Sequence, residues 1–178
     1  DADGFFHTGD VGEIDADGFL RVTDRKKDLI VTAGGKNIAP QPIENRLKLN
    51  PLIAEAVMIG DRRPHPIVLL VPNAGNLKAW AAQTGLGAGE LAELVKEPKV
   101  QSMLQREVER QLAGLASYEL PKKIGLLSRE FTIDGGELTP KLSVKRRVVE
   151  KRYADLIESM YESDRDHAVH VASASASA

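Results

Sequence analysis

The chain has 178 residues and a formal net charge of −2, with 42% hydrophobic and 28% charged residues, which is typical of a soluble globular protein. The near-balanced charge excludes a broad electrostatic attraction to nucleic acid. The absence of cysteine excludes disulfides, thiolate metal sites and a cysteine nucleophile. No apolar run approaches the roughly 18 residues that a membrane helix needs.

The first 23 residues are expected to form a β-hairpin, because Asp17-Gly18 lies between two apolar segments. The chain begins in turn-like sequence and its first methionine is Met58. We therefore expect the chain to be a piece of something longer. Residues 24–28 carry charge and no apolar side chain, so we expect an exposed hinge between two rigid bodies there.

A mixed α/β pattern follows, and we expect one small domain over residues 29–162. Strands are expected at residues 29–32, 53–59, 67–71, 124–127 and 131–133. Helices are expected at residues 42–49, 76–83, 90–96 and 99–115. A last helix, capped by Ser143, carries an apolar stripe from Val144 to Met160. The tail, residues 163–178, ends in alternating Ser and Ala and is expected to be disordered.

Basic side chains gather at the start of the last helix. Residues 141–152 hold six basic side chains and one acidic side chain. Positive charge at a helix N-terminus opposes the helix dipole, so stability alone does not explain the cluster. The pattern indicates that Lys145 meets an anion. The charge alone leaves open that Lys145 is an ordinary solvated lysine.

Three further segments are candidates for binding. They contain Asp10 after a turn glycine, Arg25 and Lys27 in the charged junction, and the Gly-Gly-Lys loop at residues 34–36. Taken singly, each segment also fits a plain turn or a charged surface. The four histidines show no metal-ligand spacing, so we predict no metal site, and no Ser/His/Asp arrangement for nucleophilic catalysis is present.

Taken together and in this order, the segments resemble motifs of the adenylate-forming superfamily. They are Phe-His-Thr-Gly-Asp at 6–10, Asp-Arg-Lys-Lys-Asp at 24–28, Gly-Gly-Lys-Asn-Ile-Ala-Pro at 34–40, and Leu-Thr-Pro at 138–140 followed by Lys145 and Arg146. The junction and the Leu-Thr-Pro form are most similar to AMP-forming long-chain fatty acyl-CoA ligases. The resemblance covers residues 1–160 and implies an α+β fold: a small mixed α/β C-terminal lid domain, preceded by a β-hairpin from the end of the N-terminal domain.

The resemblance also implies roles for individual residues. Asp10 and Arg25 match the residues that bind the adenosine ribose, and Lys27 falls at the hinge position. Gly34, Gly35 and Lys36 match the segment that lines the pantetheine tunnel of coenzyme A. Lys145 matches the catalytic lysine of the adenylation step. Many relatives carry Ser-Gly before that lysine, where this chain has Ser143-Val144, so Lys141 remains an alternative for the role.

The activity implied is ATP-dependent, AMP-forming ligation of a fatty acid to coenzyme A. ATP and Mg²⁺ would be bound mainly by an N-terminal domain of the same enzyme, and this part alone is expected to be inactive. The resemblance implies a cytoplasmic protein and leaves peripheral membrane association open. Two alternatives remain: a stand-alone module that binds an anion or a regulatory partner, and the lid of another adenylate-forming enzyme, such as a luciferase-like or carrier-protein-loading enzyme.

Overall fold

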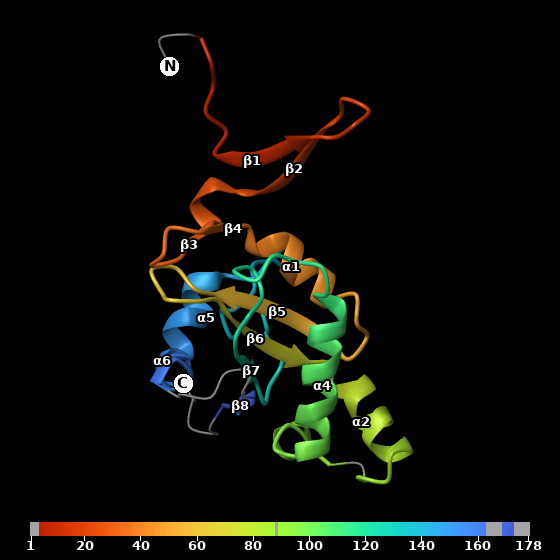
Figure 1. Cartoon of the computed structure of the whole chain (residues 1–178). Coiled ribbons are helices and arrows are strands. Elements are labelled where there is room, and N and C mark those ends of the chain that lie inside the picture. The colour runs from red at the N-terminus through yellow and green to blue at the C-terminus, as the bar shows by residue number, and fades with distance from the viewer. Residues whose placement is uncertain (1–3, 88, 163–168, 173–178) are drawn as a thin grey trace.

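The computed structural model describes residues 4–87, 89–162 and 169–172. Its strands are β1 (Asp10–Ile14), β2 (Leu20–Arg25), β3 (Ile30–Val31), β4 (Asn37–Ile38), β5 (Ile53–Ile59), β6 (Ile67–Pro72), β7 (Ile124–Leu126) and β8 (Val169–Val171). Its helices are α1 (Pro40–Leu47), α2 (Ala74–Gln83), α3 (Leu91–Leu94), α4 (Pro98–Gln111), α5 (Arg146–Arg152) and α6 (Ala154–Glu162), with a 3₁₀ turn η1 (Lys26–Asp28). Figure 1 shows that most of the hairpin of β1 and β2 projects from a mixed α/β body, which the end of β2 contacts at α1.

The predicted N-terminal hairpin is confirmed, since β1 and β2 pair antiparallel. Its turn is closed by the Asp15 carboxylate, which accepts hydrogen bonds from the backbone N–H groups of Asp17 and Phe19. Gly18 has a φ of +85°, which a glycine adopts without steric cost. The large apolar side chains of the hairpin are 58–88% exposed, so they contribute nothing to the core of the body: Phe5, Phe6, Ile14, Phe19, Leu20 and Val22.

The body is built on a four-stranded sheet with the order β5-β6-β7-β8. β5 and β6 are antiparallel, whereas β6, β7 and β8 run parallel. Every residue of β6 is buried, as expected for a strand covered on both faces. β8 lies in the tail that we predicted to be disordered, and for residues 169–171 that prediction is wrong. Residues 163–168 and 173–178 of the tail lie outside the described residues.

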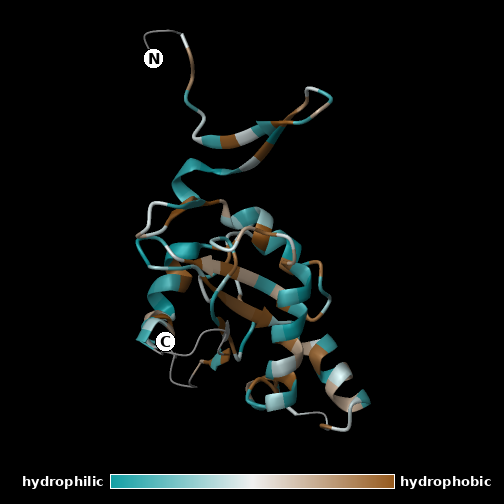
Figure 2. Cartoon of the chain, viewed as in Figure 1, coloured by the Kyte–Doolittle hydropathy of each residue, from teal (hydrophilic) through white to brown (hydrophobic). Residues whose placement is uncertain are grey.

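Helices cover both faces of this sheet, and Figure 2 shows the apolar β6 between helices with hydrophilic outer faces. Neighbouring side chains of a strand point to opposite faces. Leu70 of β6 therefore packs with residues of α1, α2 and α4, whereas Leu69 packs with residues of α5 and α6. β7 approaches α6 closely at Gly125, where an added Cβ would lie 2.6 Å from Leu69 Cδ2 and 3.0 Å from Met160 Sδ.

The structure corrects several predicted elements. Residues 131–133 form no strand. The last helix is broken at Tyr153 (φ −105°, ψ 25°), and Lys145 rather than Ser143 is the N-cap of α5. The predicted hinge, residues 24–28, is not uniformly exposed, because Asp24 is only 1% exposed. No helix within the described ranges has the length and apolarity needed to cross a membrane.

Candidate functional site

The backbone around Lys145 is held in a fixed turn. Leu138 and Val144 form an isolated antiparallel bridge. Leu142 adopts a positive φ of 59° within the turn. Lys145 donates its backbone N–H to the carbonyl of Glu137 at 2.7 Å. The Lys145 side chain itself is exposed, so a rigid backbone carries a solvent-accessible ammonium.

The turn is anchored by the side chain of Glu137, which is fully buried. Its carboxylate pairs with Arg129 and with Arg152 in the last turn of α5. Burial favours the neutral acid and by itself would raise the pKa of Glu137. The pKa is nevertheless below its usual value, because the carboxylate accepts hydrogen bonds from backbone N–H groups, including that of Thr132, and lies beside the two guanidinium groups. One ionised carboxylate therefore ties the segment before Lys145 to the helix after it.

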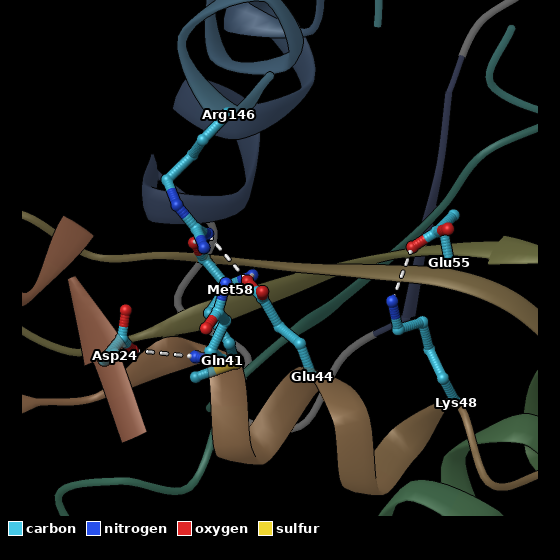
Figure 3. A network of polar contacts seen from close by, with 7 residues as sticks. All are labelled: Asp24, Gln41, Glu44, Lys48, Glu55, Met58 and Arg146. Atoms are coloured by element: carbon cyan, nitrogen blue, oxygen red, sulfur yellow. Dashed lines mark hydrogen bonds and ion pairs between the residues drawn. The ribbon is translucent and has the colours of Figure 1, made fainter. Parts of the chain in front are cut away.

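A second polar network fixes the residue that follows Lys145, and Figure 3 shows it. Glu44 of α1 accepts a hydrogen bond from the Met58 N–H and one from Arg146 Nη1 at its Oε1, each at 2.7 Å. Arg146 Nη1 also donates to the Met58 carbonyl. Near the start of α1, Asp24 Oδ2 accepts a hydrogen bond from the backbone N–H of Gln41 at 3.1 Å. These contacts join α1, β5 and the start of α5.

A groove of about 690 Å³ brings the two predicted lysines together. It lies between α1, β5 and residues 142–147, and Lys27 and Lys145 both line it. Lys48, Arg146 and Arg147 are the other basic side chains of the lining, and Asp28, Glu44 and Glu55 are the acidic ones. Neither Lys27 nor Lys145 forms an ion pair with any residue that the structure describes. The groove can therefore offer an anion two ammonium groups that no described ion pair occupies.

The predicted ribose-binding residues meet in the hairpin, outside this groove. Asp10 and Arg25 are cross-strand partners, and Arg25 Nε lies 2.8 Å from Asp10 Oδ1. The Arg25 side chain is 56% exposed and that of Asp10 is 27% exposed. Both groups are therefore accessible to a polar ligand. A carboxylate that accepts and a guanidinium that donates, side by side, suit a vicinal diol.

The predicted coenzyme A loop forms a third location, at the tip of the β3–β4 turn. Gly35 has a φ of +76° and donates its N–H to the Thr32 carbonyl at 2.8 Å. Nothing lies within 4 Å of the position that a Gly35 Cβ would take. Lys36 Nζ lies 5.5 Å from the ring centroid of Tyr118, a neighbour that sequence reasoning missed. Gly34 and Lys36 are likewise exposed, so the tip is free to approach another molecule.

Sequence reasoning also missed the burial of the Glu44 and Glu137 carboxylates. Glu44 shares α1 with the buried Ile43 and Leu47, and an acid beside buried positions is the one signal that could have found it. Glu137 precedes the Leu-Thr-Pro motif, and its partners, Arg129 and Arg152, lie 8 residues before it and 15 residues after it. The prediction that no metal site is present stays a prediction. Among the residues described, no group of three or more His, Asp or Glu could hold a metal ion.

Comparison with known proteins assigns the fold and the family. The family model described as "AMP-binding enzyme C-terminal domain" matches residues 27–165. The long-chain-fatty-acid–CoA ligase FadD15 of Mycobacterium tuberculosis is 39% identical over 163 residues, covering 91% of this chain and 27% of the relative. The long-chain-fatty-acid–CoA ligase ACSBG1 of Rattus norvegicus is 37% identical over 184 residues, covering 93% of this chain and 25% of the relative.

The solved structure of the A domain of carboxylic acid reductase from Segniliparus rugosus, in complex with AMP and a co-purified carboxylic acid, is similar with a TM-score of 0.72 and 27% identity. That match covers 91% of this chain and 24% of the solved chain. The expected fold, a small mixed α/β C-terminal domain of the adenylate-forming type, is confirmed. The chain spans about a quarter of the length of the relatives it matches. The chain belongs to the AMP-binding enzyme C-terminal domain family, and its relatives are long-chain fatty acid–CoA ligases.

Proposed function

We propose that this chain is the C-terminal catalytic lid of an ATP-dependent, AMP-forming long-chain fatty acid–CoA ligase. The relatives named as such ligases support the reaction class. The observation that carries the proposal is the geometry of Lys145, an exposed ammonium on a fixed backbone that lines a groove together with Lys27. A lid needs such a rigidly presented cation to act on a nucleotide bound by another domain.

In the first half-reaction a fatty carboxylate attacks the α-phosphorus of ATP. A new O–P bond forms, the bond to the β-phosphate breaks, and acyl-AMP and pyrophosphate result. Negative charge is crowded between the two reacting groups, and the Lys145 ammonium stabilises it electrostatically. Asp10 and Arg25 hold the ribose hydroxyls. The proposal assigns Mg²⁺ and most of the ATP contacts to an N-terminal domain of the same enzyme.

In the second half-reaction the thiol of coenzyme A displaces AMP from the acyl carbon. Rotation about Lys27 withdraws Lys145 and brings the loop of Gly34, Gly35 and Lys36 to the nucleotide. Glycine at the tip lets the backbone approach the pantetheine chain closely, and the open space at Gly35 supports this role. One small domain thereby serves both half-reactions.

Half-reaction assays on the full-length enzyme test the role of Lys145. Lys145→Ala is expected to slow acyl-AMP formation about 100-fold or more, since removal of one transition-state donor commonly costs that much. Thioester formation from supplied acyl-AMP should be retained. Lys141→Ala is the matched control. If Lys145→Ala retains adenylation and Lys141→Ala loses it, the catalytic role belongs to Lys141. Equal loss of both half-reactions in Lys145→Ala would remove the residue from its assigned step.

The 178-residue chain alone is proposed to be inactive, because it spans only about a quarter of its relatives. The purified chain is incubated with fatty acid, ATP and coenzyme A, and the products are analysed by mass spectrometry. No acyl-CoA is expected. Formation of acyl-CoA above the enzyme-free control would contradict this part of the proposal.

The acceptor of the acyl group admits a second candidate. The similarity to the A-PCP didomain of a carboxylic acid reductase supports, as the alternative, an enzyme that passes the acyl group to a carrier protein. A competition between coenzyme A and a phosphopantetheinylated carrier protein, with supplied acyl-AMP and the full-length enzyme, separates the two. Preference for coenzyme A is the expected result.

A further inference from the structure

We propose that Glu44 and Arg146 form a positioning pair that holds the backbone of Lys145 where its ammonium can act in adenylation. The inference rests on the proposed function of Lys145. It concerns residues that touch neither nucleotide nor acyl group in that proposal and that act through the backbone of the lysine. The evidence is the way in which the pair occupies the free edge of β5.

β5 is an edge strand, because the sheet has the order β5-β6-β7-β8. An edge strand carries backbone N–H and C=O groups that no neighbouring strand satisfies. At Met58 both groups are taken by side chains: the N–H donates to Glu44 and the carbonyl accepts from Arg146. The pair of side chains thus occupies the place that a further strand would take. This gives Arg146 a fixed attachment to the sheet.

The pair is enclosed enough for its geometry to be specific. The Glu44 side chain is 11% exposed and the Arg146 side chain is 20% exposed. Glu44 Oε1 receives both the Met58 N–H and Arg146 Nη1. Removing either partner leaves the other charge poorly solvated, so the two residues depend on each other. A lysine at position 146 would keep the charge, but its ammonium differs in reach and geometry from Nη1, the guanidinium nitrogen that donates to both Glu44 and the Met58 carbonyl.

Lys145 lies between two attachments. Its own N–H is bound to the Glu137 carbonyl at 2.7 Å. The next residue, Arg146, begins α5 and is bound to α1 and β5 through its side chain. Loosening the second attachment lets the start of α5 shift, and the ammonium moves with it. A displacement of about 1 Å can slow an oriented reaction about 100-fold.

The test uses Glu44→Gln and Arg146→Lys in the full-length enzyme, with each half-reaction measured separately. We expect the kcat of acyl-AMP formation to fall about 10–100-fold. The KM for ATP should stay within about twofold of the parent, because the proposal gives the pair no contact with the nucleotide. The rate of thioester formation from acyl-AMP should also stay within about twofold, because the proposal gives Lys145 no part in the second step. Glu158→Gln is the matched control. It makes the same substitution in another Arg–Glu pair, with Arg63, that does not line the groove.

Folding is checked on the 178-residue chain by circular dichroism and by hydrogen exchange of the peptide covering residues 137–152. Faster exchange in this peptide, with the rest of the chain unchanged, is the expected signature of a loosened attachment. Equal loss of both half-reactions, or general unfolding by exchange, would show a purely structural pair and overturn the inference. Unchanged adenylation in both variants would overturn it as well.

The same experiment separates this inference from the function on which it rests. If Lys145→Ala retains adenylation, the assigned role of the lysine fails, whatever the pair does. If Lys145→Ala abolishes adenylation while Glu44→Gln and Arg146→Lys preserve it, only the positioning role fails.

Discussion

The buried carboxylate of Glu137 allows a quantitative test of how the lysine-bearing turn is held. Glu137→Gln keeps the size of the side chain but removes the negative charge between the Arg129 and Arg152 guanidinium groups. It leaves a neutral amide at a fully buried position beside two cations. The turn should therefore lose its anchor while the covalent frame stays the same.

The expected loss follows from the exposure of the partners. A hydrogen bond to a charged group contributes about 1.5–3 kcal/mol, and two such bonds are affected. The side chains of Arg129 and Arg152 are 40% and 27% exposed, so water compensates part of the loss. We expect the free energy of unfolding at pH 7 to fall by about 2–3 kcal/mol. For a chain of this length that corresponds to a melting temperature lower by about 4–12 °C.

The effect should depend on pH in a defined direction. The pKa of Glu137 is lowered from its ordinary value of 4.5 in the folded state. Above the ordinary value the carboxylate is ionised in both states, so its contribution to stability is fully present. As the pH falls through the lowered folded-state pKa, that contribution is lost. The difference between parent and Glu137→Gln should be constant from about pH 7 to about pH 5 and should shrink at lower pH.

Urea and thermal unfolding, followed by circular dichroism at several pH values from neutral to acidic, measure this difference. Glu158→Gln serves as the control, because its pair with Arg63 is solvent-exposed and its removal should leave the unfolding midpoint almost unchanged. The reasoning is refuted if Glu137→Gln unfolds with the parent at pH 7. It is also refuted if the two differ equally at neutral and acidic pH.

Four other substitutions test separate parts of the structure by urea unfolding and, for Arg25→Ala, also by ATP binding. Gly125→Ala should lower the free energy of unfolding by about 1–3 kcal/mol, because the added methyl group overpacks β7 against α6. Gly34→Ala, whose Cβ would meet only the Thr32 hydroxyl at 4.0 Å, should be nearly neutral. Similar effects of the two substitutions would argue against this packing. Asp24→Ala removes the buried acceptor of an α1 N–H and should cost about 1–2 kcal/mol, and a neutral result would deny that contact. Arg25→Ala should change stability by less than about 0.5 kcal/mol but weaken ATP binding by the full-length enzyme; unchanged ATP binding would exclude the ribose role.

Local patterns predicted much of the fold. The Asp17-Gly18 turn placed the hairpin, and long apolar runs placed β5 and β6. The spacing of apolar residues placed α4. The break at Tyr153 escaped prediction because the apolar period continues through it and only the backbone angles change. β8 escaped because three residues carry too little pattern, and their pairing with β7 is a long-range event.

Some residues of the candidate site were likewise predicted from local patterns, whereas others were not. Lys145 stood out in the sequence because its charge pattern and motif are local. Its place in one groove with Lys27 depends on packing between segments more than 100 residues apart and could not be predicted from spacing. Arg146, the partner of Glu44, likewise lies 102 residues away along the chain, whereas Arg129 and Arg152 lie 8 and 15 residues from Glu137. The roles of Asp10, Arg25 and the loop at residues 34–36 stay predictions.

The contact between Asp24 and Gln41 has a consequence for the proposed rotation about Lys27. The two residues lie on opposite sides of Lys27 in the chain, and a hydrogen bond of 3.1 Å joins them. Turning the lid about Lys27 would pull these residues apart, so the alternative orientation would lack this bond. A bond of about 1 kcal/mol would favour the present orientation roughly fivefold in the resting enzyme. A ligand that turns the lid would have to bind the turned form more tightly by at least that factor.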